Sequence, residues 1–283
     1  TGGTGFLGRN FYDVLNKKKD KLRLLVLSRY IQKKNNNQFI KSSLRISKKN
    51  YNKIVDFQPN IILNFAWEGI PNFSKQKCKK NLSDQKHFLT LVSKINSIKK
   101  IISIGSCLEY KKKFGECREI DKLNLSNPFS KSKVELSCFL KNLCKKKNIK
   151  FIWLRVFYIF GPYQKTHSLI PTIISSIKKR KKLQINRLNN QNDFIYVKDA
   201  CNLIYRFFSN KVDSGVYNIG SGKLTKVITI INKLYQYYGI KKILTCEKFD
   251  KNIHASQKKI RKNFKKFRFT KLDTALKETI KYF

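Results

Sequence analysis

Thr1-Gly2-Gly3-Thr4-Gly5-Phe6-Leu7-Gly8, the first eight residues, form the stretch that decides the fold of this chain. Glycines at positions 2, 5 and 8 permit a tight turn, a close approach of the backbone to a pyrophosphate and close packing of a helix on a sheet. An amphipathic helix is expected over residues 7–16 and an apolar strand over residues 22–27. Since turn, helix and strand follow at the spacing of a βαβ unit, the stretch predicts a dinucleotide site at the N-terminus of that helix.

The sequence begins inside this motif. Such a turn should follow a first strand, yet residue 1 already belongs to the turn, and the 283 residues contain no Met. We therefore expect a first strand before Thr1 to be missing from this sequence. Because that strand would be central in a doubly wound sheet, a chain without it should fold poorly by itself.

Apolar strands alternate with helices along the rest of the chain. The expected strands are 60–66, 101–104 and 151–157, with a short one near 44–46, and the expected helices are 50–57, 74–97 and one from about 127. This alternation predicts an α/β fold with a Rossmann-like, doubly wound parallel sheet and helices on both faces.

Two parts are expected within this fold. Residues 1–162 should form the dinucleotide-binding domain, to which residues 193–222 return. Residues 163–192 and 223–283 should form a small C-terminal α/β lobe for the substrate, with a strand over 183–186 and a last helix over 272–282.

The formal net charge of +45 comes from 62 Lys and Arg residues against 17 Asp and Glu residues. The excess is spread evenly, at +24 over residues 1–150 and +21 over residues 151–283. Nucleic-acid-binding proteins concentrate basic residues on one face, so this distribution favours a solvated shell of lysines. Binding of polyanions remains the alternative.

Cysteine and histidine usage predicts neither a disulfide framework nor a metal site. The seven cysteines are scattered without a C-x-x-C pair, and the three histidines show no i,i+4 spacing. No run of 18 apolar residues occurs. We expect reduced thiols, no metal, no membrane partner and a cytoplasmic protein.

The end of the strand over 22–27 indicates the cofactor. An acidic residue at this place would favour NAD by bonding the ribose 2′-hydroxyl, whereas a small polar residue followed by Arg accommodates a 2′-phosphate. Ser28 and Arg29 stand there, and Asp20 lies before the strand. The sequence thus favours NADP, with NAD possible, and the alternative is that Arg29 is only a surface charge.

Six further motifs follow in a fixed order. They are Ala66 after its strand, Ser106 four residues before Tyr110, Lys133 in a helix, Leu154-Arg155 with Gly161-Pro162, Asp193 to Ala200, and Tyr217 to Gly222. With the glycine turn they resemble the extended short-chain dehydrogenase/reductases of the NAD-dependent epimerase/dehydratase family, which act on nucleotide-linked sugars. The resemblance covers essentially the whole chain. The cofactor-binding residues that it implies are Gly2, Thr4, Gly5, Phe6, Leu7, Gly8, Ser28, Arg29, Ala66 and Lys133.

Within the family, residues 66–72 resemble a subgroup near dTDP-6-deoxy-L-talose 4-dehydrogenases and other sugar reductases of surface polysaccharides. The family's 4,6-dehydratases carry an Asp-Glu pair directly after the catalytic Ser or Thr, whereas this chain has Cys107-Leu108. The resemblance therefore implies hydride transfer at a sugar 4-position, by a reductase or an epimerase, rather than dehydration.

The catalytic residues depart from the family at one position. In the family a Tyr transfers the proton, a Lys four residues later lowers the Tyr pKa and bonds the nicotinamide ribose, and a Ser or Thr holds the substrate oxygen. Lys133 and Ser106 match, but the Tyr position is Phe129. Loss of a general acid typically costs about 10²–10⁴-fold in rate, so we expect an impaired enzyme. The candidate replacement donors are bound water, Cys107, Glu109 and Tyr110.

Two alternatives to an impaired enzyme stay open, a catalytically silent dinucleotide-binding protein and an RNA-binding member of the same fold. The tail 258–271 alternates Lys and Arg with Phe, which suits single-stranded nucleic acid. We expect instead that its Phe rings pack on the small lobe with the lysines outside.

The resemblance also implies a substrate site and a partner. The substrate-binding residues are Trp67, Glu68, Ser106, Ser168 and Asn192. Asn192 stands where the family usually has the Arg that contacts the nucleotide diphosphate, which leaves Arg180 and Arg187 as substitutes. A homodimer is implied through helices 74–97 and 129–147, whose apolar stripes include Leu82, Leu89, Leu136 and Leu140.

Overall fold

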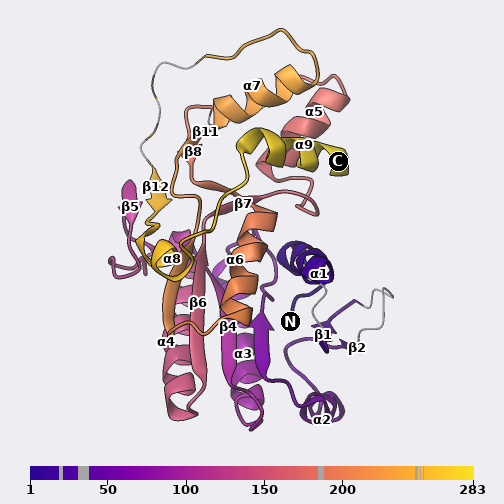
Figure 1. Ribbon diagram of the computed structural model, residues 1–283, viewed down its shortest axis with the longest axis vertical. Helices are drawn as coiled ribbons and strands as arrows, with labels where there is room; N and C mark the ends of the chain where they lie inside the picture. The colour runs from indigo at the N-terminus through magenta and orange to yellow at the C-terminus, as the bar shows by residue number, and fades with distance from the viewer. Residues whose placement is uncertain (19–21, 31–37, 184–187, 246–247, 249, 251) are drawn as a thin grey trace.

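A parallel four-stranded sheet forms the centre of the computed structural model, which describes residues 1–283 except 19–21, 31–37, 184–187, 246–247, 249 and 251 (Figure 1). The strand order is β10-β6-β4-β3. These strands are β3 (Ile61–Asn64), β4 (Lys100–Ser106), β6 (Lys150–Val156) and β10 (Gly215–Ile219). A separate parallel pair consists of β1 (Leu25–Ser28) and β2 (Gln38–Lys41).

Helices cover both faces of the sheet because its strands are apolar on both sides. Ile102 and Ile152 face one core with α1 (Phe6–Lys18) and α6 (Val197–Ser209). Their neighbours Ile101 and Trp153 face the other core. That second core includes residues of α2 (Lys48–Phe57), α3 (Lys75–Val92) and α4 (Pro128–Lys146). The predicted Rossmann-like α/β fold with a parallel sheet is thus confirmed.

A group of three helices lies beyond the carboxyl ends of the strands, at the top of Figure 1. They are α5 (Leu169–Lys178), α7 (Val227–Tyr237) and α9 (Leu272–Tyr282), which pack on one another in that order. β8 (Gln191–Asn192) pairs antiparallel with β11 (Thr225–Lys226) beneath them. The strand expected over 183–186 lies outside the described residues, and the two-part division of the chain stays a prediction.

Asp193 ties the later chain to the end of the sheet. Its carboxylate accepts hydrogen bonds from the backbone N–H groups of Ser221, Gly222 and Ala255. Around it, β7 (Tyr158–Phe160) pairs with β9 (Phe194–Tyr196). β5 (Gly115–Cys117) pairs with β12 (Ile253–Ala255). One buried carboxylate therefore links segments that are far apart in sequence.

The basic tail packs its rings inward, but on a different partner from the one expected. α8 (Lys258–Asn263) leads into Phe264, whose ring lies 5.0 Å from that of Phe207 in α6. The guanidinium of Arg206 lies 5.5 Å from the centre of the Phe267 ring. The expectation of packing on the small lobe was wrong for Phe264 and Phe267, which contact side chains of α6 instead.

The short strand expected near residues 44–46 does not form there. Ser43 accepts a hydrogen bond from the backbone N–H of Arg45 and makes a turn there. The neighbouring strand is β2, which pairs with β1 from Leu25↔Gln38 to Ser28↔Lys41.

Three of the four leucines proposed for a dimer face lie inside the protein. Leu89, Leu136 and Leu140 are buried in the core between α3, α4 and the sheet, and Leu82 packs partly against it. Their role as an intersubunit stripe was therefore wrong, because the helices need these side chains to cover their own sheet.

A cavity of about 640 Å³ lies between β1 and β3. Val26 and Phe39 line it from the strand pair, Leu63 lines it from β3, and Phe11 lines it from α1. The start of the chain borders it, where the backbone of Thr1 bonds to Leu63 and Phe65.

Within the described ranges, no helix combines the length and the apolar character needed to cross a membrane.

Candidate active site

The glycine turn packs so closely that two of its glycines cannot be replaced. Gly2 has φ +67°, and a Cβ there would lie 2.8 Å from the backbone nitrogen of Ala66 at the end of β3. A Cβ at Gly8 would lie 2.3 Å from the carbonyl oxygen of Gly2. These contacts seat the N-terminus of α1 against the carboxyl edge of the sheet, where its N–H groups suit a phosphate.

A cavity of about 290 Å³ opens at this turn. Eight of the predicted cofactor-binding and substrate-binding residues line it, namely Gly2, Thr4, Gly5, Ser28, Arg29, Ala66, Trp67 and Glu68. The hydroxyls of Thr4 and Ser28 are 2.7 Å apart and fix the end of β1 to the turn. The glycine cradle, the helix N-terminus and the cationic end of β1 together fit a dinucleotide.

Three predicted cofactor residues of α1 lie elsewhere. Phe6 and Leu7 pack against the apolar core, and Gly8 borders the larger cavity beside β1. They position the turn, but they do not line the cavity of about 290 Å³.

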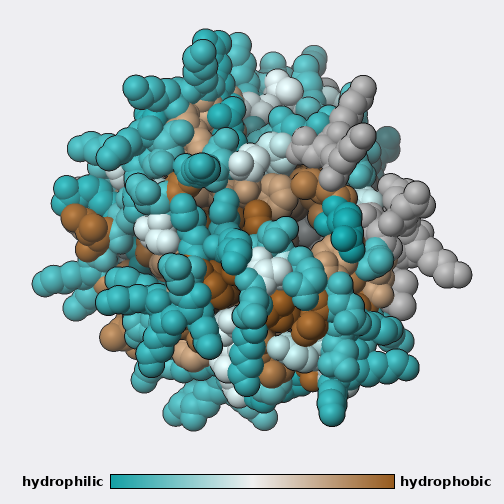
Figure 2. Space-filling model, turned by 60° about the horizontal axis from the view of Figure 1, so that its bottom comes forward, coloured by the Kyte–Doolittle hydropathy of each residue, from teal (hydrophilic) through white to brown (hydrophobic). Residues whose placement is uncertain are grey.

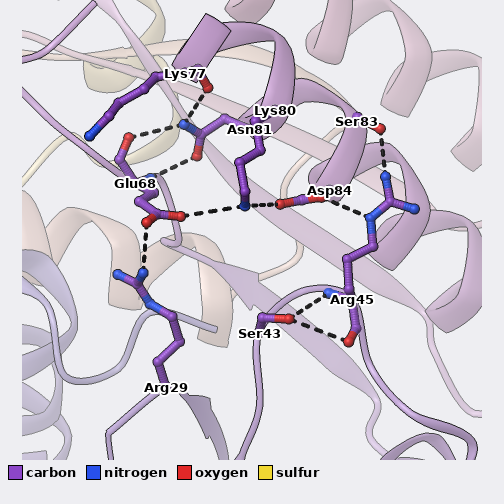
Figure 3. Close-up of polar contacts among 9 residues, drawn as sticks. All are labelled: Arg29, Ser43, Arg45, Glu68, Lys77, Lys80, Asn81, Ser83 and Asp84. Atoms are coloured by element: carbon purple, nitrogen blue, oxygen red, sulfur yellow. Dashed lines mark hydrogen bonds and ion pairs between the residues drawn. The ribbon is translucent and has the colours of Figure 1, made fainter.

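Charged side chains of the cavity lining form ion pairs with one another (Figure 3). Arg29 donates to Glu68 at 2.8 Å, and Lys80 of α3 lies 3.7 Å from the other carboxylate oxygen of Glu68. The sequence predicted Glu68 as a substrate residue, whereas the structure places its carboxylate on the residue predicted for the cofactor. Sequence reasoning missed Lys80 and Asp84, although their i,i+4 spacing with opposite charges was visible.

Lys133 of α4 lies buried next to this cavity. Its Nζ donates to the backbone oxygen of Ile104 at 2.8 Å and lies 3.9 Å from the centre of the Trp67 ring. Burial lowers the pKa of Lys133 from 10.5 to about 7, against the opposing effect of Glu109. Trp67 thus connects the predicted cofactor cavity with the predicted catalytic lysine.

Phe129 belongs to an aromatic cluster over that lysine. It is 3% exposed. Its ring centre lies 5.6 Å from that of Trp67 and 4.4 Å from that of Phe73, a residue that sequence reasoning missed. The Lys133 amine lies 5.9 Å from the Phe129 ring, so the two predicted catalytic positions share one face of α4.

Ser106 ends β4 beside the start of α4. It begins the short helix η1 (Cys107–Glu109), and its Oγ accepts from the N–H of Leu108 at 3.2 Å. Ser130 of α4 donates to the backbone oxygen of Leu108 at 2.5 Å. This bond holds the Ser106 turn against the helix that carries Phe129 and Lys133.

Of the three side chains considered as replacement donors, two bond to other side chains, and the third, Cys107, is buried. Glu109 is buried and accepts from Trp153 and Arg155. Tyr110 donates to Asn218 at 2.6 Å, and burial raises its pKa well above the ordinary value. Burial likewise raises the pKa of the Cys107 thiol.

The remaining predicted substrate residues come from the second part of the chain. Ser168 precedes α5 as its N-cap residue. Asn192 is buried, and its side-chain oxygen accepts from Asn252 at 2.8 Å. Arg180 follows α5 with φ +51°, and Arg187 lies outside the described residues.

Comparison with known proteins gives a family match over most of the chain. Residues 1–220 match the model described as NAD dependent epimerase/dehydratase family. A 70-residue stretch is 34% identical to the GDP-6-deoxy-D-talose 4-dehydrogenase of Aggregatibacter actinomycetemcomitans. This match covers 24% of each protein, so the chain matches about a quarter of that relative's length.

Two further matches extend over nearly the whole length. The ADP-L-glycero-D-manno-heptose-6-epimerase of Brachyspira hyodysenteriae is 26% identical over 262 residues, which cover 84% of this chain and 80% of that protein. A solved structure of dTDP-glucose 4,6-dehydratase from Bacillus anthracis, in complex with NAD, matches with a TM-score of 0.84 at 23% identity. It covers 99% of this chain and 94% of the other, and at this identity the likeness shows the fold alone.

Proposed function

The chain belongs to the NAD dependent epimerase/dehydratase family, and from this premise we propose that it is a nucleotide-sugar reductase or epimerase acting at a sugar 4-position. We further propose that it works slowly because Phe129 stands in place of the proton-transferring Tyr. The observation that carries the proposal is the packing of Lys133 and Phe129 around Trp67, which lines the cavity at the glycine turn.

The residues of the cavity suit a nicotinamide dinucleotide. When bound, that cofactor would supply or accept the hydride at the sugar carbon. Gly2, Gly5 and the N-terminus of α1 would hold the pyrophosphate, and Ser28 with Arg29 would hold the adenosine end. Arg29 favours NADP over NAD in this proposal.

Lys133 and Ser106 are the two predicted catalytic side chains that can act on the cofactor and the sugar. Lys133 is held by Ile104 and Trp67 and would bind the nicotinamide ribose. The Ser106 hydroxyl accepts from Leu108, which leaves its own proton to hold the sugar oxygen. Phe129 contributes shape but no proton, so we propose that proton transfer is the defective step.

The relatives support the substrate class. Two of them are named for nucleotide-linked sugars, GDP-6-deoxy-D-talose and ADP-L-glycero-D-manno-heptose. The first is a 4-dehydrogenase, in agreement with the proposed position of hydride transfer. The sugar, the nucleotide and the product stereochemistry have to be identified by experiment.

Restoring the hydroxyl tests the proposal. We expect Phe129→Tyr to raise turnover at least about tenfold, because Lys133 and Ser106 still flank that position. For a reductase the assay follows oxidation of NADPH with a panel of dTDP-, UDP- and GDP-linked 4-keto sugars. For an epimerase it follows interconversion of the 4-epimers of the corresponding nucleotide sugars, because epimerisation consumes no NADPH. Phe114→Tyr, at an exposed position outside α4, adds a hydroxyl outside the aromatic cluster and should leave the rate unchanged.

Two results would contradict this expectation. Equal and brisk turnover by the wild-type protein and Phe129→Tyr would show that another group donates the proton. If neither turns over while both bind the dinucleotide, the silent dinucleotide-binding alternative is favoured, and Asn192 is the next position to restore to Arg.

We also propose a homodimer in the cytoplasm. α3 and α4 lie side by side, and α4 presents Phe139 and Leu143 as partly buried apolar residues in addition to the core leucines. A cytoplasmic location would keep the six described free cysteines reduced. Sedimentation velocity should give twice the monomer mass, and a monomer at micromolar concentration would refute the dimer.

A further inference from the structure

The carboxylate of Glu68 lies between two cations of the lining of the proposed cofactor cavity (Figure 3). One oxygen accepts from Arg29 at 2.8 Å, and the other lies 3.7 Å from Nζ of Lys80. All three residues line the same cavity as Gly2 and Ser28. An anion of the chain itself therefore occupies the position next to the guanidinium.

The backbone of Glu68 is fixed from α3. Its N–H donates to the side-chain oxygen of Asn81 at 2.7 Å, and its carbonyl oxygen accepts from the Asn81 amide at 3.0 Å. Asn81 itself is buried. The loop after β3 thus delivers this carboxylate to the end of β1, and the contact with Arg29 is a consequence of the fold.

The pair can be opened by a competing anion. The side chains of Arg29 and Glu68 are 52% and 45% exposed, and exposed ion pairs contribute little to stability. Lys80 has a second partner, Asp84, at 2.7 Å, and Asp84 also accepts from Arg45 at 2.8 Å. Three cations face two carboxylates in this network, which leaves one positive charge for an incoming anion.

We propose that Glu68 sets the choice between the phosphorylated and the unphosphorylated dinucleotide by competing with the 2′-phosphate for Arg29. The inference rests on the proposed function in one respect, that this cavity binds a nicotinamide dinucleotide. A 2′-phosphate must displace the carboxylate and then lie near it, whereas a 2′-hydroxyl leaves the Arg29–Glu68 pair intact. Glu68 accordingly weakens NADPH binding and leaves NADH binding nearly unchanged.

The test is a binding titration rather than an activity assay. We expect Glu68→Gln to lower the NADPH dissociation constant about three- to tenfold, and to change that of NADH less than about twofold, by calorimetry or by quenching of protein fluorescence. In an Arg29→Gln background the same substitution should lower the NADPH dissociation constant by a clearly smaller factor, because the competition for Arg29 is absent and only repulsion between the carboxylate and the 2′-phosphate is relieved. Glu116→Gln, at an exposed position of β5, is the matched control.

The outcomes separate this inference from the proposed function. If the wild-type protein binds a dinucleotide but Glu68→Gln binds NADPH equally or more weakly, the carboxylate only orients Arg29 and the inference is overturned. If Glu68→Gln lowers the NADPH dissociation constant by the same factor in the Arg29→Gln background, Arg29 is not the competed group. If the wild-type protein and Glu68→Gln bind neither dinucleotide, the proposed function fails and this inference fails with it. Circular dichroism of each variant shows that the fold is retained.

Discussion

At the scale of single residues, the buried amine of Lys133 makes the stability of the protein depend on pH. Its pKa falls from 10.5 to about 7 because the amine is buried. Between these values the unfolded chain binds a proton that the folded chain lacks. Stability therefore rises with pH across this window, by up to about 1.4 kcal/mol per pH unit, and the penalty for burying the charge is complete below pH 7.

Lys133→Met should remove this dependence. We expect the unfolding free energy of the wild-type protein, relative to Lys133→Met, to rise by about 2 kcal/mol between about pH 7 and about pH 9 in urea titrations. The other buried titrating groups, such as Cys107 and Tyr110, are present in both proteins, so they cancel in the difference. Parallel pH curves for the two proteins would show that the amine is not deprotonated on folding.

The residues of the candidate site differ in how far the sequence could predict them. Gly2 is predictable because a left-handed turn and a close backbone contact leave no alternative to glycine. Lys133 is predictable from its motif, and the structure places it next to Trp67. The pairing of Glu68 with Arg29 was not predictable, because it depends on the path of a loop that Asn81 fixes from another helix.

At the scale of elements, Lys100 joins a strand to a helix. From the start of β4 its Nζ donates to the carbonyl oxygens of Phe207, Phe208 and Asn210, at 2.8, 3.0 and 3.2 Å. These carbonyls end α6 and have no partner in a further helical turn. A cation at this end also favours the helix dipole.

Removing that amine should destabilise the protein. Lys100→Met should lower the unfolding free energy by about 1–2 kcal/mol in urea titrations, since three carbonyls lose a charged donor. Lys99→Met is the matched control, because the neighbouring lysine is exposed and bonds the Asn96 carbonyl, and its effect should stay within about 0.5 kcal/mol. Equal effects of the two substitutions would refute the capping role of Lys100.

The elements themselves could be predicted where burial decides them. β4 and β6 are apolar on both sides, and the sequence predicted both within a few residues. β2 was misplaced because 38–41 and 44–46 each contain a short apolar segment. The choice between them is made by pairing with β1 and by the Ser43 turn, neither of which local sequence reveals.

At the scale of the whole molecule, the charge of +45 is a property of the surface and not of one site. Figure 2 shows hydrophilic residues spread across the face in view, with apolar side chains between them in separate places. The rings of the basic tail pack inward, since Phe264 is buried against Phe207 and both Phe267 and Phe269 pack partly buried against the same core. Single-stranded nucleic-acid binding through exposed aromatic residues is therefore disfavoured in this segment.

Diffuse charge predicts a particular salt dependence. RNA binding that depends only on counterion release weakens steeply as the salt concentration rises. A dedicated RNA-binding site keeps part of its affinity through stacking and hydrogen bonds. We expect the dissociation constant for a single-stranded RNA, measured by fluorescence anisotropy, to rise at least about a hundredfold from about 50 to about 200 mM salt. NADPH binding, which relies on few charges, should change much less in the same buffers. Submicromolar RNA affinity that survives physiological salt would instead favour the RNA-binding alternative. It would imply a dedicated RNA-binding site, which the even spread of lysines over the chain gives no reason to expect.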